Sequence, residues 1–326
     1  MSQPPYHLRT NKAADRFAFI EAMRRLERLA GPLAEYTYYG LGGAYLEDIR
    51  LVYEFYPEIS MVSIEENGEI CSRQEFHRPC ADDRLQLENN TLKSFIATYE
   101  AKDEKSIFWL DYTRLDYTCF RDFITLLGKI AVGSLVKITL RAHPADYWTW
   151  EGERPLERKG KPEQFRRRFA AVLPDQSAYP HWSAKGFAEL LQRMLQIAAQ
   201  QALPAEATPF AFQPVSSFYY SDSTSMFTLT GVLWPRGDAA AVEKAFNGWQ
   251  FANLTWTSPK LIDIPDLSTK ERLHLQRYLP CSTPPGATLR AKLGHLIEED
   301  IAKSEAALDQ YAAFHRYFPY FLRGTP

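Results

Sequence analysis

The sequence predicts an α/β protein with a doubly wound, Rossmann-like sheet, in which five parallel strands precede an antiparallel terminal β-hairpin. Two observations carry this prediction. Between residues 34 and 143, short apolar segments alternate with segments of helical periodicity, which is typical of successive βαβ units. Farther along, PVSSFYY (214–220) and MFTLTGVLW (226–234) flank a polar turn, which indicates a hairpin.

The individual elements follow from apolar spacing and from glycine and proline punctuation. The expected strands are 36–40, 61–64, 84–89, 106–113 and 134–142. The expected helices between and around them are 12–30, 46–56, 69–77, 120–130 and 184–202, and residues 91–99 form either a short helix or a turn. After the hairpin we expect helices and loops, with Leu275 and Leu279 on one helix and a second helix from Ala291 to Phe314.

These elements divide the chain into three regions. We expect an N-terminal helical segment (1–33), an α/β domain (34–234) and a helical C-terminal extension (235–326). An irregular insert, 145–183, interrupts the domain after the fifth strand.

Composition limits the classes of function. The formal net charge of −2 gives no overall attraction to nucleic acid or to a membrane surface. The sequence contains no apolar run of membrane-spanning length and no apolar signal core at its start. The four cysteines are scattered, which favours free thiols in a reducing cytoplasm over disulfides or a zinc cluster.

A glycine turn and an acid form the most informative motif. The first strand runs into Gly40-Leu41-Gly42-Gly43, and the second strand ends on Glu65, at about the 20-residue spacing of a nucleotide-binding βαβ unit. Glycines allow a ligand to approach the backbone, and the carboxylate accepts hydrogen bonds from ribose hydroxyls. The motif therefore predicts a cofactor that contains a ribose.

The order of strands, with its terminal hairpin, resembles the class I S-adenosylmethionine-dependent methyltransferases over about residues 34–234. The segment GLGGAYLEDI…MVSIE…WLDYT is also similar to a bacterial branch of O-methyltransferase-like proteins. The resemblance implies S-adenosyl-L-methionine as cofactor. It places small residues of the glycine turn at Gly40, Gly42 and Ala44, with Gly43 beside them, and assigns Glu65 to the ribose. Asn90 then meets the adenine, and Asp111 faces the methyl donor and the acceptor.

The turn departs from the family pattern at two positions. The family usually has an acid two residues before the first glycine, and this chain has Tyr38 there. The third small position is Ala44, which adds a methyl group to a crowded turn. Glu47 and Asp48 either supply the missing charge or are ordinary carboxylates in the first turn of a helix.

Asp111 and His143 are the candidate bases, because each follows a strand at its carboxyl end. We prefer Asp111, since its position at a strand end is the clearer one. Asp111-Tyr112-Thr113 does not match the Asp/Asn-Pro-Pro-Tyr signature of amino-methylating nucleic-acid enzymes. The sequence also lacks the Asp-Asn pair of metal-dependent O-methyltransferases, so no metal site is expected.

The insert contains two basic clusters, Arg158-Lys159-Gly160-Lys161 and Arg166-Arg167-Arg168, together with four glutamates. It is either a contact surface or a solvated face whose charges balance. We expect a small-molecule or protein acceptor, with a protein partner possible at the insert or the C-terminal extension, and nucleic acid less favoured.

The leading hypothesis is S-adenosylmethionine-dependent methyl transfer to oxygen, with the acceptor undefined. The alternative is a catalytically inactive methyltransferase-like scaffold or interaction subunit of a bacterial complex, which Tyr38 favours. A dinucleotide-dependent oxidoreductase is disfavoured by the terminal hairpin and by Ala44.

Overall fold

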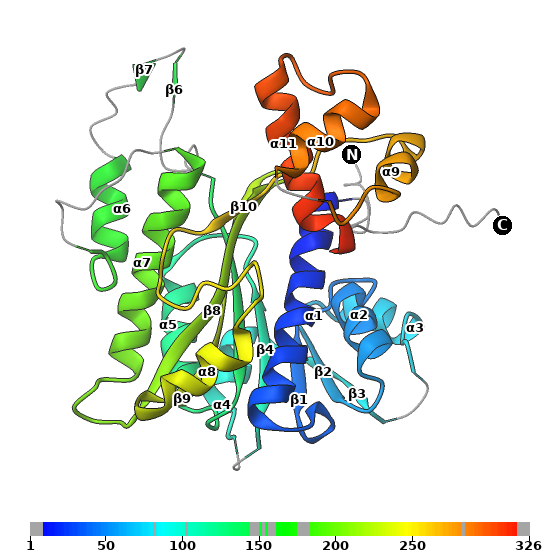
Figure 1. The fold of residues 1–326 in the computed structure, drawn as a ribbon. Coiled ribbons are helices and arrows are strands. Elements are labelled where there is room, and N and C mark those ends of the chain that lie inside the picture. Colours follow the sequence, from blue (N-terminus) through cyan, green and yellow to red (C-terminus); the bar gives the residue numbers. More distant parts are fainter. Residues whose placement is uncertain are drawn as a thin grey trace. The chain divides into compact units, whose positions relative to one another are not determined.

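The computed structural model contains an eight-stranded sheet with the strand order β10-β8-β9-β5-β4-β1-β2-β3 (Figure 1). The structure describes residues 9–80, 83–101, 104–143, 150–151, 154–155, 161–174, 183–281 and 284–317. The strands are β1 (Thr37–Gly40), β2 (Ser60–Glu65), β3 (Leu85–Asn89), β4 (Ser106–Asp111), β5 (Leu135–Arg141), β8 (Phe210–Ser221), β9 (Ser225–Pro235) and β10 (Lys260–Ile262).

The pairing of the strands confirms the predicted class of fold. β1 pairs in parallel with β2 and β4, β2 with β3, and β4 with β5. β9 then runs antiparallel to β5, with Leu135 opposite Val232 and Arg141 opposite Met226. The sequence did not predict β10, because three residues are too short to show strand alternation.

The chain divides into two compact units, which we name the sheet unit and the helical unit. The sheet unit comprises residues 19–219 and 224–260. The helical unit comprises the residues up to 18, residues 220–223 and the residues from 261 onward. Within the described parts of both units, none of the helices has the length and apolar character needed to cross a membrane.

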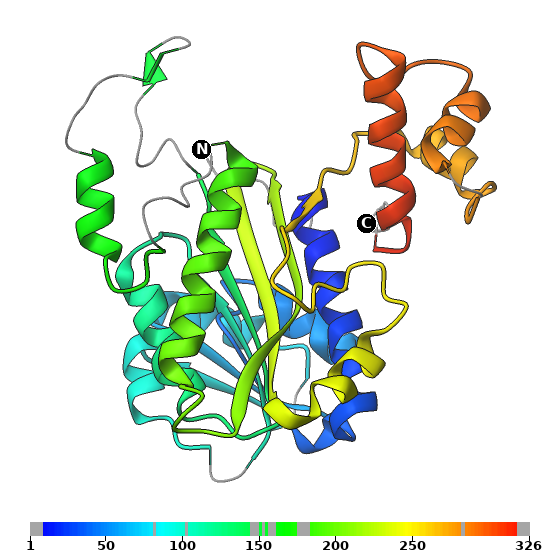
Figure 2. The same ribbon diagram turned by 60° about the vertical axis from the view of Figure 1, so that its left-hand side comes forward.

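Helices of the sheet unit cover both faces of its sheet (Figures 1 and 2). Alternate residues of β4 show the two layers. Trp109 packs on Phe19 of α1 with ring centroids 5.2 Å apart, whereas Phe108 and Leu110 belong to the core on the opposite face. The helices of this unit are α1 (Thr10–Ala30, which begins in the helical unit), α2 (Glu47–Phe55), α3 (Gly68–Phe76), α4 (Leu92–Thr98), α5 (Tyr117–Leu127), α6 (Lys161–Phe169), α7 (Ala184–Ala202) and α8 (Ala239–Phe246).

Side-chain caps fix where several of these helices begin. Asn67 accepts from two backbone N–H groups at the start of α3, and Thr91, Asp116 and Ser183 each accept from one at the starts of α4, α5 and α7. Such caps satisfy N–H groups that have no partner inside the helix. Asp116 explains why α5 begins three residues before its predicted start.

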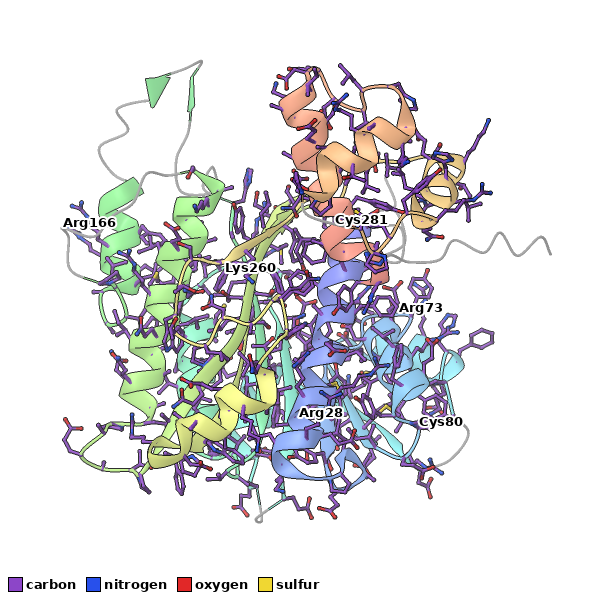
Figure 3. The ribbon with its side chains drawn as sticks, viewed as in Figure 1. Arg28, Arg73, Cys80, Arg166, Lys260 and Cys281 are labelled. Atoms are coloured by element: carbon purple, nitrogen blue, oxygen red, sulfur yellow. The ribbon has the colours of Figure 1, made fainter. Side chains whose placement is uncertain are left out.

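The insert contains more structure than the sequence predicted. Residues 150–151 and 154–155 pair as the short strands β6 and β7, and α6 contains the second basic cluster. Phe165 and Phe169, one turn apart on α6, are buried and contact Phe187 and Phe120. This apolar pair anchors a helix whose Arg166 lies exposed at the surface (Figure 3). Of the first basic cluster, residues 158–160 lie outside the described residues.

The helical unit contains α9 (Thr269–Gln276), α10 (Pro285–Leu293) and α11 (Ile301–Phe314) around a small core of Leu267, Leu275, Leu289, Leu308 and Tyr311. Two predictions here were wrong. The helix expected from Ala291 to Phe314 is divided at Gly294, whose φ of +76° ends α10. Leu279 lies beyond the end of α9, so it does not share that helix with Leu275.

A glycine on α10 sets the close approach of α10 to α11. A Cβ added at Gly286 would lie 2.1 Å from the backbone oxygen of Glu305, and the Gly286 N–H donates to Asp309 Oδ1 at 2.7 Å. We expect Gly286→Ala to cost about 1–3 kcal/mol, the range for overpacking. Thermal unfolding would measure it. Gly68→Ala, at an unobstructed position in the first turn of α3, is the control and should cost nothing. An unchanged midpoint for Gly286→Ala would contradict this account of the packing.

Candidate cofactor site

The predicted site residues come together at the carboxyl edge of the parallel strands. Asp111 ends β4, Gly40 ends β1 and Glu65 ends β2, and Asn90 directly follows β3. Since β4, β1, β2 and β3 are neighbours in the sheet, these residues form one row, which we name the strand-end row. This edge is where open α/β sheets bind ligands.

The glycine turn between β1 and α2 has an unusual backbone. Gly42 and Gly43 are left-handed, with φ values of +56° and +57°, and Leu46 repeats this conformation at +53° immediately before α2. The Gly43 N–H donates back to the Leu41 carbonyl at 2.5 Å. Only glycine adopts this region without a steric cost, so the turn needs glycine at 42 and 43.

The three glycines have different surroundings. At Gly40 an added Cβ would lie 2.9 Å from the ring of Tyr38, and at Gly42 it would lie 2.7 Å from both Leu46 Cδ2 and Ser63 Oγ. At Gly43 nothing lies within 4 Å of the added atom. Gly40 and Gly42 therefore allow close internal packing, and Gly43 is the position with room for a ligand.

Tyr38 occupies the position at which the family resemblance implies an acid. Its side chain is fully buried on β1, and its ring extends along the strand to cover Gly40. The residue therefore fills the space beside the first glycine with an aromatic ring, and the carboxylate expected there is absent from this position.

Glu65 has one carboxylate oxygen in use. Its Oε1 accepts from the Asn67 N–H at 2.9 Å, and its Oε2 has no hydrogen-bond partner among the described residues. Its backbone carbonyl accepts from the Asn90 N–H and from Asn89 Nδ2, each at 3.1 Å. The ends of β2 and β3 are thus tied together, and one carboxylate oxygen remains available at the edge.

The segment after Asp111 is held on two sides. The Tyr112 N–H donates to the Thr139 carbonyl of β5 at 3.0 Å, and the Tyr112 hydroxyl donates to Asp122 Oδ2 of α5 at 3.2 Å. Burial raises the pKa of Tyr112 well above its usual value, and the charge of Asp122 adds to this. Burial also raises the pKa of Asp122. This pair therefore anchors the end of β4.

His143 lies two residues beyond β5, the next strand along the row. In the sheet register Thr139 of β5 is opposite Asp111, and His143 comes four residues after Thr139. Its Nδ1 is buried and has no hydrogen-bond partner among the residues that the structure describes.

Two site residues were not predicted from the sequence. Gln74 of α3 and Ser63 of β2 are both completely buried, and they hydrogen-bond to each other beneath the glycine turn. Ser63 gave a usable signal, because it is a polar residue in the middle of an apolar strand. Gln74 gave none, since it lies in a mostly polar helix.

Metal ligands are not grouped among the described residues of this edge. Nowhere in the described part of the chain do three or more His, Cys, Asp or Glu side chains gather so that they could hold a metal ion. The four cysteines, Cys71, Cys80, Cys119 and Cys281, are free thiols.

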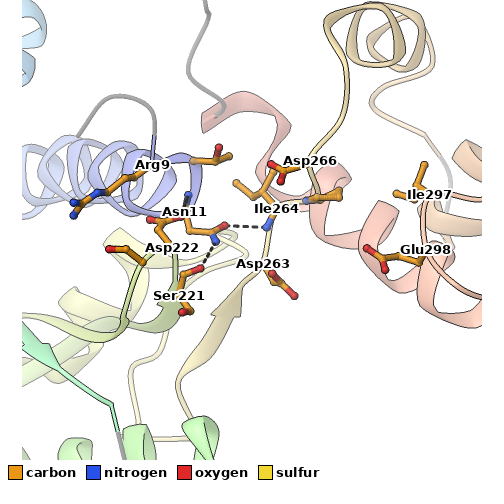
Figure 4. A pocket seen from close by; sticks show the side chains of 12 residues that line it. Arg9, Asn11, Ser221, Asp222, Asp263, Ile264, Asp266, Ile297 and Glu298 are labelled. Atoms are coloured by element: carbon orange, nitrogen blue, oxygen red, sulfur yellow. Dashed lines mark hydrogen bonds between the residues drawn. The ribbon is translucent and has the colours of Figure 1, made fainter. Parts of the chain in front are cut away.

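A cavity of about 520 Å³ lies in the helical unit (Figure 4). Several of its polar groups already have partners. Asp222 accepts from the Asn11 and Lys12 N–H groups, and the Asn11 side chain joins Ser221 O to the Ile264 N–H. Burial raises the pKa of Asp222, and the two N–H bonds oppose that rise. These hydrogen bonds join three segments of the chain at the border of the cavity.

Comparison with solved structures gives distant similarities in fold. One is a probable spermidine synthase from Corynebacterium glutamicum, at 10% identity over 78% of this chain and 81% of that one, with a TM-score of 0.45. Another is Trm1 from Pyrococcus horikoshii with S-adenosyl-L-methionine, at 9% identity over 72% and 59%, with a TM-score of 0.46. A third is the plantazolicin methyltransferase BpumL with S-adenosylhomocysteine, at 8% identity over 68% and 84%, with a TM-score of 0.41.

Comparison with curated protein sequences found no match. A family model, in contrast, matches residues 4–325, which is nearly the whole length of the chain. The match includes the glycine turn, the strand-end row, the insert and the helical unit. The protein belongs to the family described as "Putative O-methyltransferase".

Proposed function

We propose that the protein transfers a methyl group from S-adenosyl-L-methionine to an oxygen atom of a small-molecule or protein acceptor. One observation carries the proposal. Gly43, with open space beside it, lies in the turn that follows β1, and Glu65, with an available carboxylate oxygen, ends the adjacent parallel strand β2 at the ligand-binding edge of the sheet. Membership of the family supports the type of reaction.

The residues at this edge fit the cofactor. Glu65 would accept hydrogen bonds from the ribose hydroxyls, the backbone at Gly43 would meet the amino-acid portion, and Asn90 would meet the adenine. The Tyr38 ring, which packs on Gly40, would lie beneath the turn together with Gly42. When bound, the cofactor supplies an electrophilic methyl group on a sulfonium sulfur.

Asp111 would remove the proton from the acceptor. It ends β4, directly beside β1 in the sheet, and is partly exposed. A carboxylate in that position orients an acceptor hydroxyl and takes its proton as the oxygen attacks. His143, at the end of β5, is the second candidate for this role.

The insert offers a surface for an acceptor or a partner protein. Arg166, Arg167 and Arg168 are exposed on α6, within a chain of net charge −2. That overall charge favours a protein or small molecule over nucleic acid. The free thiols support a reducing compartment, and we propose the cytoplasm.

The second candidate function is a scaffold that has lost catalysis. Tyr38 favours it, because an aromatic ring covers Gly40 where a carboxylate would hold the cofactor's amino group. A protein of this kind would keep the sheet and bind the cofactor weakly or not at all.

Gly43→Ala tests the proposed pocket. The added methyl group would project into the space assigned to the cofactor, so we expect affinity for S-adenosylhomocysteine to fall at least about tenfold, as for about 1.4 kcal/mol. Equilibrium dialysis would measure it. Gly248→Ala is the matched control, because Gly248 also has a positive φ (+70°) and nothing within 4 Å.

Both variants should lose about 1–2 kcal/mol of stability from the left-handed backbone. Only Gly43→Ala should lose affinity. Equal affinities for the two variants would remove the glycine turn from the binding site.

A further inference from the structure

A single buried amide supports the glycine turn from below. Gln74 Nε2 donates to the Gly43 carbonyl at 2.9 Å and to the Leu41 carbonyl at 3.5 Å, and its Oε1 accepts from Ser63 Oγ at 3.1 Å. Gln74 has no exposed surface and Ser63 has none. Both ends of the amide are therefore used, and the three contacts join α3, β2 and the turn.

The contact with the Gly43 carbonyl determines which way the next peptide group faces. In a trans peptide the C=O and the N–H point in opposite directions. Because the Gly43 carbonyl points at Gln74, the N–H of Ala44 points away from α3. That N–H donates to no residue in the described part of the chain.

The same amide also encloses Gly42. A Cβ at Gly42 would lie 2.7 Å from Ser63 Oγ and 3.4 Å from Gln74 Nε2, so the turn rests directly on this pair. Two successive left-handed residues are a conformation that the chain leaves easily unless contacts hold it. The hydrogen bonds of Gln74 supply those contacts from a site that water does not reach.

α3 contacts the other half of the predicted site as well. Its N-cap residue Asn67 donates from its backbone to Glu65 Oε1 at 2.9 Å, and Cys71 Sγ lies 3.5 Å from the Glu65 carbonyl oxygen. In the last turn of α3, Arg73 donates to the Tyr45 hydroxyl at 2.8 Å (Figure 3). One short helix thus sets the position of Glu65 relative to the glycine turn.

We infer that Gln74 is a positioning residue for the cofactor: it fixes the glycine turn so that the Ala44 N–H faces the open side of Gly43, where it can donate to an anionic group of the ligand. This inference rests on the proposed function. A backbone N–H in a left-handed turn is a recurrent donor to carboxylate and phosphate groups. Gln74 does not touch the ligand and acts only through the turn.

Gln74→Glu gives a test with a pH signature. In its neutral form the introduced carboxyl group donates to the Gly43 carbonyl and still accepts from Ser63, so the turn is kept. In its charged form it faces two carbonyl oxygens in a buried site. Burial and those oxygens both raise the pKa of the introduced carboxyl group, so the neutral form is present at low pH and is lost as pH rises through that pKa.

Isothermal titration calorimetry with S-adenosylhomocysteine would follow this change between about pH 5 and about pH 8, an interval that lies above the ordinary pKa of a carboxyl group. We expect Gln74→Glu to bind like wild type at the acidic end. Relative to wild type, its affinity should fall at least about tenfold at the alkaline end. Gln74→Met, which cannot donate at any pH, should be weak throughout.

Gln192→Glu is the matched control. Gln192 of α7 is also buried and donates through Nε2 to two backbone carbonyls, Trp256 O at 2.9 Å and Thr257 O at 2.6 Å. It should lose thermal stability with rising pH in the same way, and it should bind S-adenosylhomocysteine like wild type. This control separates positioning of the turn from a general loss of stability.

Hydrogen exchange of the ligand-free protein gives a second readout. Gln74→Met should speed exchange of the amides in residues 42–46 and leave β4 and β5 as in wild type. If wild type binds S-adenosylhomocysteine and both Gln74 variants bind it equally well at every pH, this inference is overturned alone. If wild type does not bind it, the proposed function falls and this inference falls with it.

Discussion

Replacing Asp111 by Asn is expected to lower methyl transfer at least about a hundredfold, the low end of the loss for a general base. The amide keeps the shape of the side chain at the end of β4 and removes its ability to take a proton. S-adenosylhomocysteine affinity should be unchanged, because the residue is proposed to face the acceptor and not the nucleoside. Turnover with an identified acceptor, measured beside calorimetric binding, separates the two effects.

His143→Asn is the comparison variant for Asp111→Asn. His143 lies at the end of the neighbouring strand and has a buried Nδ1, so it is the second candidate base. We expect His143→Asn to keep most of the turnover. Normal turnover in Asp111→Asn together with loss in His143→Asn would transfer the role of base to His143.

Replacing Glu65 by Ala is expected to weaken cofactor binding by about 1.5–3 kcal/mol, the scale of a hydrogen bond to a charged group. The affinity for adenosine should fall in parallel, because the lost contact is to the ribose. In the Ala variant, 2′-deoxyadenosine should bind little worse than adenosine. Competition against labelled S-adenosylhomocysteine would measure the affinities of the cofactor, adenosine and 2′-deoxyadenosine.

Glu66→Ala is the control for Glu65→Ala. Glu66 is the next residue, is exposed, and carries the same charge, so its loss changes the local charge without changing the proposed contact. The thermal unfolding of both variants should also be measured, because Glu65 accepts a hydrogen bond from the Asn67 N–H at the start of α3 and therefore contributes to stability as well. Equal ligand affinities for Glu65→Ala and Glu66→Ala would show that Glu65 does not hold the ribose.

The fold of the sheet unit was predictable because its signals are local. Most of the parallel strands are short apolar runs, with the largely polar β3 (LQLEN) as the exception, and the helices that follow them have either a clear apolar spacing or a capping residue such as Thr91 or Asp116. α6 was missed because consecutive arginines hide the apolar pair of Phe165 and Phe169, which only tertiary contacts make visible. In the helical unit, the break at Gly294 was missed because the sequence around it continues with good helix formers.

The sequence was enough to predict which residues lie at the ends of the parallel strands, but not the contacts between side chains around them. Gly43 and Glu65 follow from spacing along the chain, because parallel strands bring their carboxyl ends to one edge. The packing of Tyr38 on Gly40 and the support of the turn by Gln74 depend on side chains that meet only after folding. No spacing rule links residue 74 to residue 43.

We propose that the edge formed by the glycine turn and Glu65 binds S-adenosyl-L-methionine. The most direct measurement is a crystal structure of the protein grown with saturating S-adenosylhomocysteine. We expect the ribose hydroxyls within hydrogen-bond distance of Glu65, and the amino-acid portion of the ligand beside Gly43 and the Ala44 N–H. A ligand bound elsewhere, for example in the cavity of the helical unit, or a strand-end row without ligand, would contradict it.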